Sequence, residues 1–315
     1  MKKILFLTLI APLMVVSCHR DTTICQDPNP PLEFGTIKFT ALQANKAYTG
    51  ALEMFPCKAN TTLYVGNYIR EKVSVINPSC VVNQGMITTW GYQLWLPLGS
   101  YNMVYWGVGN SQTYGASMVE QPTLTLGGDV STLFWSLKIN ADQTTYMPVL
   151  DQVMAVQNVA IGGSSLSVNL ARMVAGLNVV IKNSTAKPLD TSINSIEVMV
   201  GGIAEKLNFV TGAPINQTKT VRFALTIDPK NRTQASNQTA MLYPSIQMPQ
   251  IVINIYLSNG QKKSYETKLK NAFTANSIQT ITILIGDILA SDPTSTAFTI
   301  DHWQETSQTI DVPLI

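Results

Sequence analysis

The sequence predicts an all-β protein with two β-sandwich domains in tandem. Three observations support this fold class. Short runs of alternating apolar residues recur along the chain and are separated by turn residues, the pattern of strands joined by tight connections. Thr, Ser, Asn, Gln, Val and Ile dominate the sequence, a balance that favours strands over helices. The third observation is that no amphipathic helical period is longer than two turns.

The first 17 residues predict an export signal. Lys2 and Lys3 precede an uncharged, largely apolar run from Ile4 to Val16, which is shorter than the about 20 residues that a membrane-spanning helix needs. The run ends next to Ser17-Cys18, in a sequence similar to a bacterial lipobox. We therefore expect cleavage between Ser17 and Cys18 and acylation of Cys18, which would hold the chain on a membrane surface. The alternative is an ordinary secretory signal with a Cys near its cleavage site by chance.

Residues 18–33 predict a lipidated tether. The segment is polar and contains Pro28, Pro30 and Pro31, so it buries too little apolar surface to fold and reads as an extended linker. Ordered structure is expected from Phe34 onward. We place the N-terminal sandwich at 34–160 and the C-terminal sandwich at 161–315, with Gly162 and Gly163 marking the boundary.

A hairpin over residues 87–110 is the clearest local feature of the first domain. Trp90, Tyr92, Leu94 and Leu96 alternate on the first arm. Pro97 to Ser100 would form the turn, with Gly99 supplying a positive φ. Further strands of this domain are expected at residues 36–42, 62–66, 72–76, 123–126, 131–139 and 153–161.

The second domain is expected to begin with two alternating runs, at residues 166–170 and 177–181, with a helical turn or bulge over Arg172 to Gly176. Asn259-Gly260 predicts a hairpin between two later strands. The last residues, 309–315, alternate Ile310, Val312 and Leu314 and suit either a strand donated to a partner or one that closes its own sandwich. We favour closure. Other strands are expected at 195–202, 205–212, 219–227, 250–260, 261–269, 277–286, 297–303 and 308–315.

Three cysteines remain once Cys18 is acylated, so they cannot all form pairs. Cys57 and Cys80 are 23 residues apart, and a disulfide between them is geometrically possible. Cys25 lies in the polar leader, where a free thiol is least constrained. The alternative is that all three stay unpaired. No Cys-x-x-Cys spacing occurs, so neither a zinc nor a redox motif is supported.

Enzymatic chemistry is not predicted. The sequence holds only His19 and His302, and adjacent Asp301 and His302 on one strand would point to opposite faces, which excludes a relay between them. No His/Cys/Asp/Glu cluster has ligand spacing and no glycine-rich phosphate loop occurs, so we expect no metal and no cofactor. Charged residues make up 13% of the chain and the net charge is +2, which excludes an electrostatic nucleic-acid surface.

Aromatic residues are the one chemical concentration in the sequence. Trp90, Trp95 and Trp106 lie within the predicted hairpin, where they could stack on sugar rings as a ligand-facing platform. The alternative is that they form the domain core, since a large aromatic side chain buries 150–250 Å². Trp90 and Trp95 differ in parity and cannot share one face of a regular strand. The core interpretation is favoured.

The chain resembles the Bacteroidales fimbrillin superfamily, and in particular its minor or anchoring fimbrial subunits. The resemblance rests on the lipobox, the polar leader, the Leu96-Pro97-Leu98-Gly99-Ser100-Tyr101 turn, and three longer stretches at residues 170–183, 195–212 and 298–315. It implies two transthyretin-like, Greek-key sandwiches, export to the outer membrane, and assembly into a fimbria by β-strand addition.

A departure from the family pattern bears on the role. In polymerising members a protease cuts after an Arg near the start of the first domain and releases the first strand. Here Arg70 is the only Arg between the tether and the second domain, and none follows residues 36–42 directly. The resemblance therefore favours an anchor or accessory subunit whose partners are other fimbrial subunits, with the outer membrane reached through the lipid and host or glycan surfaces as further contacts. The alternative function is a carbohydrate-binding surface lipoprotein.

Overall fold

The computed structural model describes residues 39–109, 119–162, 165–286 and 300–309. These residues form two large β-sheets and one small hairpin, and they contain no α-helix, as the sequence predicts. The one helical element among them is a single 3-10 turn, η1, at Val130–Thr132. No helix of the described ranges has the length and apolar character to cross a membrane.

The first sheet has eight strands in the order β12-β11-β8-β3-β6-β7-β1-β2, and β1 also pairs with β12. The sequence predicts a two-layered sandwich here, whereas the hydrogen bonding joins these strands into one sheet that closes on itself. The strands are β1 (Phe39–Gln43), β2 (Lys46–Ala47), β3 (Gly50–Lys58), β6 (Ser79–Asn83), β7 (Met86–Tyr92), β8 (Gly99–Gly109), β11 (Gln152–Ile161) and β12 (Leu166–Arg172). The small hairpin is β4 (Asn67–Ile69) with β5 (Lys72–Ser74).

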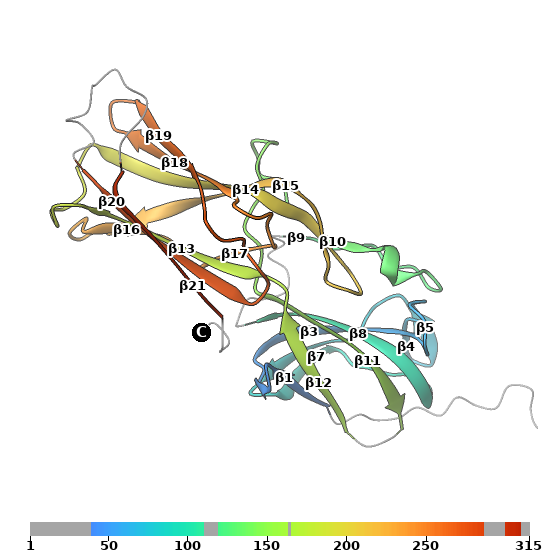
Figure 1. The fold of residues 1–315 in the computed structure, drawn as a ribbon. Helices are drawn as coiled ribbons and strands as arrows, with labels where there is room; N and C mark the ends of the chain where they lie inside the picture. Colours follow the sequence, from blue (N-terminus) through green and yellow to red (C-terminus); the bar gives the residue numbers. More distant parts are fainter. Residues whose placement is uncertain (1–38, 110–118, 163–164, 287–299, 310–315) are drawn as a thin grey trace, which may run out of the picture. The chain divides into compact units, whose positions relative to one another are not determined.

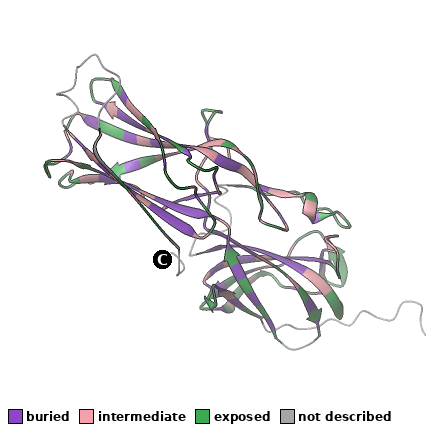
Figure 2. Cartoon of the chain, viewed as in Figure 1, coloured by how far each residue is buried: buried purple, intermediate pink, exposed green. Residues whose placement is uncertain are grey.

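The two faces of the first sheet belong to different cores, and buried positions recur along its strands (Figure 2). On β3, Leu52 and Met54 lie in a core with Val168 and Leu170 of β12. Phe55 and Cys57, which alternate with those positions on β3, instead belong to the larger core, which lies between the layers of the second sheet. This division follows from the two-residue period of a strand, which sends successive side chains to opposite faces.

The predicted hairpin between residues 87 and 110 is wrong. β7 pairs with β6, while β8 pairs with β3 and β11. Between them, the side chain of Asn67 accepts a hydrogen bond from the Trp95 amide at 2.8 Å and donates one to the Gln93 carbonyl at 2.9 Å. The connection is therefore held extended against the β4–β5 hairpin and does not bring the arms together. Gly99 has the expected positive φ, at 150°.

The second sheet has eleven strands and folds into two layers joined at one edge (Figure 1). The main path is β19-β18-β14-β15-β16-β13-β20-β21, and β15 meets β16 at only two residue pairs. Apolar side chains of both layers share the larger core. The strands are β9 (Val119–Glu120), β10 (Phe134–Leu137), β13 (Ala175–Asn183), β14 (Ile193–Asn208), β15 (Pro214–Ile227), β16 (Gln234–Ser236), β17 (Ala240–Leu242), β18 (Gln250–Leu257), β19 (Lys262–Lys268), β20 (Ser277–Ile285) and β21 (Ile300–Thr309).

Local predictions for the second sheet have mixed outcomes. Asn259-Gly260 forms the β18–β19 hairpin as predicted, with Gly260 at a φ of 85°. The two strands expected at 195–202 and 205–212 are one 16-residue strand, β14, because a bulge with Gly202 at a φ of 76° keeps the chain in the sheet. Residues 123–126 form no strand, and Arg172 to Gly176 form neither a helical turn nor a bulge.

The sheets divide the chain differently from the expected boundary at residue 160. β9 and β10, at 119–137, pair with the second sheet through β14, whereas β12, at 166–172, belongs to the first. The chain therefore crosses between the sheets three times before β13 begins. The two domain ranges stay a prediction.

Candidate functional site

The three tryptophans proposed as a ligand platform lie in different surroundings. Trp106 is buried, with 1% of its surface exposed, and its indole Nε1 donates to the Phe209 carbonyl at 2.8 Å. Trp90 is partly buried against the core of the first sheet, and Trp95 is 38% exposed in the extended connection. Trp106 therefore lies in the core, Trp90 packs against a core and Trp95 faces outward, and a role of these residues in ligand binding stays a prediction.

The disulfide considered between Cys57 and Cys80 is not formed, and both residues are buried free thiols. The strand register gives the reason. Cys80 lies opposite Leu52, and Cys57 is five residues further along β3, or about 16 Å at the rise of a strand. A disulfide needs Cα atoms within about 7 Å. Burial raises the pKa of each thiol to about 12, so neither is a reactive nucleophile.

The predicted signal and lipid residues, Ser17 and Cys18, lie outside the described residues, as do Cys25 and His19. His302 falls within β21, in a part whose side chains are not described. Over the described ranges no group of three or more His, Cys, Asp or Glu residues is placed to hold a metal ion. No constellation suited to catalysis emerges from these positions.

A buried ion pair marks the place where the chain crosses between the sheets. Arg172, at the end of β12, donates to both carboxylate oxygens of Asp151, at 2.6 and 3.0 Å. Their side chains are 1% and 4% exposed. Arg172 also donates to the Asn276 side chain at 3.1 Å, and the Asp151 carbonyl accepts from the Gly109 amide at 2.8 Å. These four residues, which we call the junction cluster, tie the ends of β8, β11 and β12 to the segment before β20.

The junction cluster is not among the features predicted from the sequence, although the sequence contains one signal for it. Arg172 continues the alternation of Leu166, Val168 and Leu170, so it occupies a position that should be buried. A buried guanidinium requires a carboxylate partner. The sequence could not say which acidic residue supplies it, because Asp151 lies 21 residues away on a neighbouring strand.

The second sheet has two edge strands with different chemistry. β19 carries Lys262, Lys263 and Lys268, and Lys263 is buried with 2% exposure, facing the core beside Ile255. Lysines on an edge, and inward-pointing charges above all, discourage a foreign strand from pairing there. β21 contains neither lysine nor proline, and its one described neighbour is β20, with which it pairs over its whole length.

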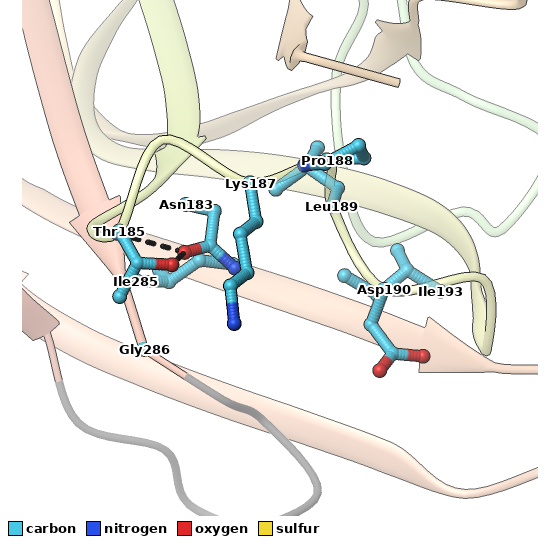
Figure 3. A pocket seen from close by; sticks show the side chains of 9 residues that line it. All are labelled: Asn183, Thr185, Lys187, Pro188, Leu189, Asp190, Ile193, Ile285 and Gly286. Carbon is cyan, nitrogen blue, oxygen red and sulfur yellow. Dashed lines mark hydrogen bonds between the residues drawn. The ribbon is translucent and has the colours of Figure 1, made fainter. Parts of the chain in front are cut away.

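A shallow pocket of about 240 Å³ lies where the chain leaves β13 and β20 (Figure 3). Three of its polar side chains, those of Asn183, Thr185 and Asp190, form hydrogen bonds within the loop. The Asn183 side chain accepts from the amide and hydroxyl of Thr185, and the Asp190 carboxylate accepts from the Ser192 amide at 2.7 Å, which lowers its pKa. No aromatic side chain lines the pocket, so it offers no surface for stacking on a sugar. The lining residues are Asn183, Thr185, Lys187, Pro188, Leu189, Asp190, Ile193, Ile285 and Gly286.

One acidic side chain, that of Glu53, has a pKa shifted toward neutral pH. Burial raises the pKa of Glu53 to about 7, against a smaller lowering by a hydrogen bond with Asn77. Glu53 lies on β3 between Ser79 of β6 and Trp106 of β8. The Tyr64 hydroxyl lies near enough for the Glu53 charge to contribute to its raised pKa. None of the groups that shift the pKa of Glu53 is a cation, so no positive charge offsets the effect of burial on this carboxyl.

The fold and the candidate site do not by themselves identify the protein family, and a comparison with known families does. A sequence profile of the fimbrillin-A associated anchor proteins Mfa1 and Mfa2 matches residues 36–309. The chain belongs to this family. The match spans both sheets, so the whole described fold is that of a fimbria-associated structural protein, and the resemblance found in the sequence is confirmed.

Solved structures similar to this family member come from Bacteroides and Porphyromonas. A candidate cell adhesion protein of Bacteroides uniformis is 13% identical, with 87% of this chain and 97% of that chain covered and a TM-score of 0.51. A candidate polysaccharide-binding protein of Bacteroides thetaiotaomicron is 14% identical, with 80% and 93% covered and a TM-score of 0.52. The fimbrial anchor protein Mfa2 of Porphyromonas gingivalis is 9% identical, with 86% and 97% covered and a TM-score of 0.48.

Identities this low show a shared fold and no more. A search of curated protein sequences finds no match. Membership of the anchor family therefore rests on the profile, and it supports a fimbria-associated protein at the cell surface that contacts other fimbrial subunits.

Proposed function

We propose that this protein anchors a fimbria to the outer membrane. The lipid on Cys18 would hold the N-terminal tether at the membrane, and the second sheet would receive an extended strand from a fimbrial shaft subunit. Family membership supports the fimbrial role, and the lipobox supports the attachment. Two acyl chains on one residue suit stable attachment, since a single chain binds a bilayer only marginally.

The observation that carries the proposal is the contrast between the two edges of the second sheet. An added strand gains main-chain hydrogen bonds along an exposed edge, and alternate side-chain positions give it specificity. Three lysines disfavour this addition at β19. At β21, Gln304, Thr306 and Ser307 are exposed and uncharged. We therefore assign the strand-accepting edge to β21.

The state of β1 supports an anchor over a polymerising subunit. β1 is paired with β12 at five positions, so the first strand is in place. Arg70 lies in the β4–β5 turn at a φ of 51°. A cut after Arg70 would separate β1 together with the central strand β3, which is not the release of a single strand. Glycan binding gains no comparable support, because the three tryptophans are dispersed.

A binding experiment tests the strand-accepting edge. The full chain carrying Gln304→Lys and Thr306→Lys on β21 should lose binding to purified shaft subunit while its melting temperature stays close to wild type, because both positions are exposed. Glu266→Lys, on the β19 edge, is the matched control and should bind normally. Equal binding by all three proteins would remove β21 from the mechanism. Binding of a second copy of this chain in place of the shaft subunit would contradict the assigned partner.

A further inference from the structure

The first strand of the described fold is held mainly by a parallel partner. β1 pairs with β12 in parallel register from Phe39 opposite Leu166 to Gln43 opposite Leu170. On its other side it meets β7 at one pair, Thr40 opposite Met86, and the short strand β2 at two pairs, Leu42 opposite Ala47 and Gln43 opposite Lys46. Hydrogen bonds in a parallel ladder are evenly spaced along the strands. β1 is therefore attached to the sheet chiefly by a continuous row of such bonds to β12.

The strand register separates the two ends of the first sheet. At one end β8, β11 and β12 meet, with Gln152 opposite Val108 and Val153 opposite Arg172. All three strands continue from this end to the second sheet, the shortest link being Met173-Val174 between β12 and β13 (Figure 1). Phe39, where the chain enters β1, lies at the opposite end.

The junction cluster fastens the end at which the strands cross. Arg172 and Asp151 join β12 to the start of β11, and Arg172 also donates to Asn276, which directly precedes β20 of the second sheet. The Asn276 amide also donates to the Val174 carbonyl at 2.9 Å. Tension between the two sheets is therefore carried by several backbone segments that are bound to one another, and it enters the first sheet at the C-terminal end of β12.

We propose that the β1–β12 ladder is a force-bearing clamp for a chain pulled between its tether and its partner. This inference rests on the proposed anchoring function. The tether pulls β1 from its N-terminal end, while the second sheet pulls β12 from its C-terminal end. Because the strands are parallel, these forces slide one strand along the other and load all the bonds of the ladder together. An antiparallel pair pulled at the same two chain ends would open one bond at a time.

A force applied to the chain after β1 loads the sheet differently. Asn45 lies in the turn after β1, at the end of the sheet where the strands cross. A pull applied there reaches β3 through β2 and leaves β1 unloaded. Gly50, the first residue of β3, lies opposite Gly109, the last residue of β8. The sheet would then be peeled from the end of antiparallel strands, which resists force far less.

Force measurements on the single molecule compare the two loading geometries in the same fold. The protein is the full mature chain with Cys18→Ala and Lys187→Cys, held by the native Cys25 and by residue 187. Lys187 is exposed just after β13, so the pull runs along the β13 backbone into β12. Cys57 and Cys80 are buried thiols with pKa values raised to about 12, so they do not take handles. The control replaces Cys25 by Ser and carries Asn45→Cys. Because the Asn45 side chain accepts a hydrogen bond from Asn169 of β12 at 3.2 Å, the test protein carries Asn45→Ser, so that both proteins lack the asparagine side chain.

We call the protein held at Cys25 and residue 187 the Cys25 geometry, and the protein held at residues 45 and 187 the Asn45 geometry. At the same force, we expect the protein in the Cys25 geometry to unfold at least about tenfold more slowly than in the Asn45 geometry. Forced unfolding measures this difference because it is governed by the unfolding rate. Equal rates in the two geometries would overturn the clamp. No fimbrial partner is present in this experiment, so its failure leaves anchoring intact. Conversely, a clamp that holds while the shaft subunit fails to bind would refute the anchoring proposal alone.

A variant provides a second, independent test. The Ala41 amide donates to Gly85 on the β7 side, so the alternation of the strand directs the Thr40 amide toward β12. Thr40 is exposed, and Thr40→Pro removes that donor. The unfolding rate of the Thr40→Pro variant under force should be higher than that of the parent protein in the Cys25 geometry and the same as that of the parent protein in the Asn45 geometry. A rise of equal size in both would show a general loss of stability and would contradict the clamp.

Discussion

Arg172 and Asp151 are the residues whose chemistry departs furthest from the rest of the fold. They form a charged pair with almost no exposed surface in a protein whose described ion pairs otherwise lie in partly exposed positions. Removing one member of a buried pair leaves the other charge uncompensated, which costs about 3–5 kcal/mol. The pair therefore belongs to the structure of the crossing between the sheets.

A substitution series tests this role. Arg172→Ala should lower the free energy of unfolding by about 3–5 kcal/mol in urea titrations. Arg222→Ala is the matched control, since Arg222 lies 3.3 Å from both Asp142 and Glu197 but is 34% exposed. It should cost less than about 1 kcal/mol. Similar losses in the two variants would show that burial of the Arg172 pair has no special role.

Glu53 predicts a dependence of stability on pH. Its folded pKa of about 7 lies above the ordinary 4.5, so the folded state binds the proton more tightly than the unfolded state. Stability from this group is present at low pH and is lost as pH rises from about 4.5 to about 7. The full loss is on the order of 3 kcal/mol, since each pKa unit corresponds to about 1.4 kcal/mol.

Glu53→Gln should abolish that loss, since an amide stays neutral at every pH. The variant should match wild type near pH 4.5 and be the more stable protein at pH 8 in denaturant titrations. A wild-type stability that is flat or rises between these pH values, with no gain from the substitution, would contradict the burial argument. Glu266→Gln serves as the control, because Glu266 is an exposed residue of β19.

At the scale of elements, the edges of the second sheet show how strand chemistry controls association. Lys262 and Lys268 are exposed on β19, one near each end of the strand. Replacing both by Thr keeps the propensity for strand and removes the charges that repel another edge. The double variant should self-associate more than wild type in light-scattering measurements.

A control with equal charge separates this edge effect from net charge. Lys187 and Lys230 are exposed in loops, and replacing both by Thr lowers the net charge by the same two units. This protein should keep the wild-type state of association. Equal association by the two double variants would show that net charge alone, and not the edge, controls it.

Local signals in the sequence predicted elements well and strand partners poorly. Asn259-Gly260 identified a hairpin because the turn itself fixes the pairing of its two strands. The run from 87 to 110 contains two strands at the expected places, but their partners come from distant segments, and Asn67 holds the connection between them extended. The turn that does pair β7 uses Gln84-Gly85, with φ values of 47° and 82°, and it lies outside that run.

The same limit applies to the candidate site. Trp90, Trp95 and Trp106 are close in sequence, but burial separates them, since the strand period and the core decide where each side chain goes. The junction cluster is assembled from residues 109, 151, 172 and 276, and only the three-dimensional register unites them. Edges are likewise properties of the assembled sheet, so the contrast between β19 and β21 becomes visible only after pairing is known.

At the scale of the whole molecule, the proposed function needs both a lipid on Cys18 and a fimbrial partner on the second sheet. The anchor family and the lipobox support this arrangement. Along the sequence, the parallel ladder of β1 with β12 and the junction cluster come after the predicted tether and before β21. The central claim is therefore that fimbriae stay on the cell because this chain holds them to its membrane.

The distribution of shaft subunit between cells and medium tests that claim most directly. Cells that lack the natural gene are complemented with wild type or with Cys18→Ala, and shaft subunit is quantified in the washed cell pellet and in the culture medium. Cys18→Ala removes the thiol that we propose is acylated, and with it the proposed apolar attachment to the bilayer. We expect that fimbriae still assemble but that most of the shaft subunit is released to the medium. Fimbriae that remain on Cys18→Ala cells at the wild-type level would contradict it.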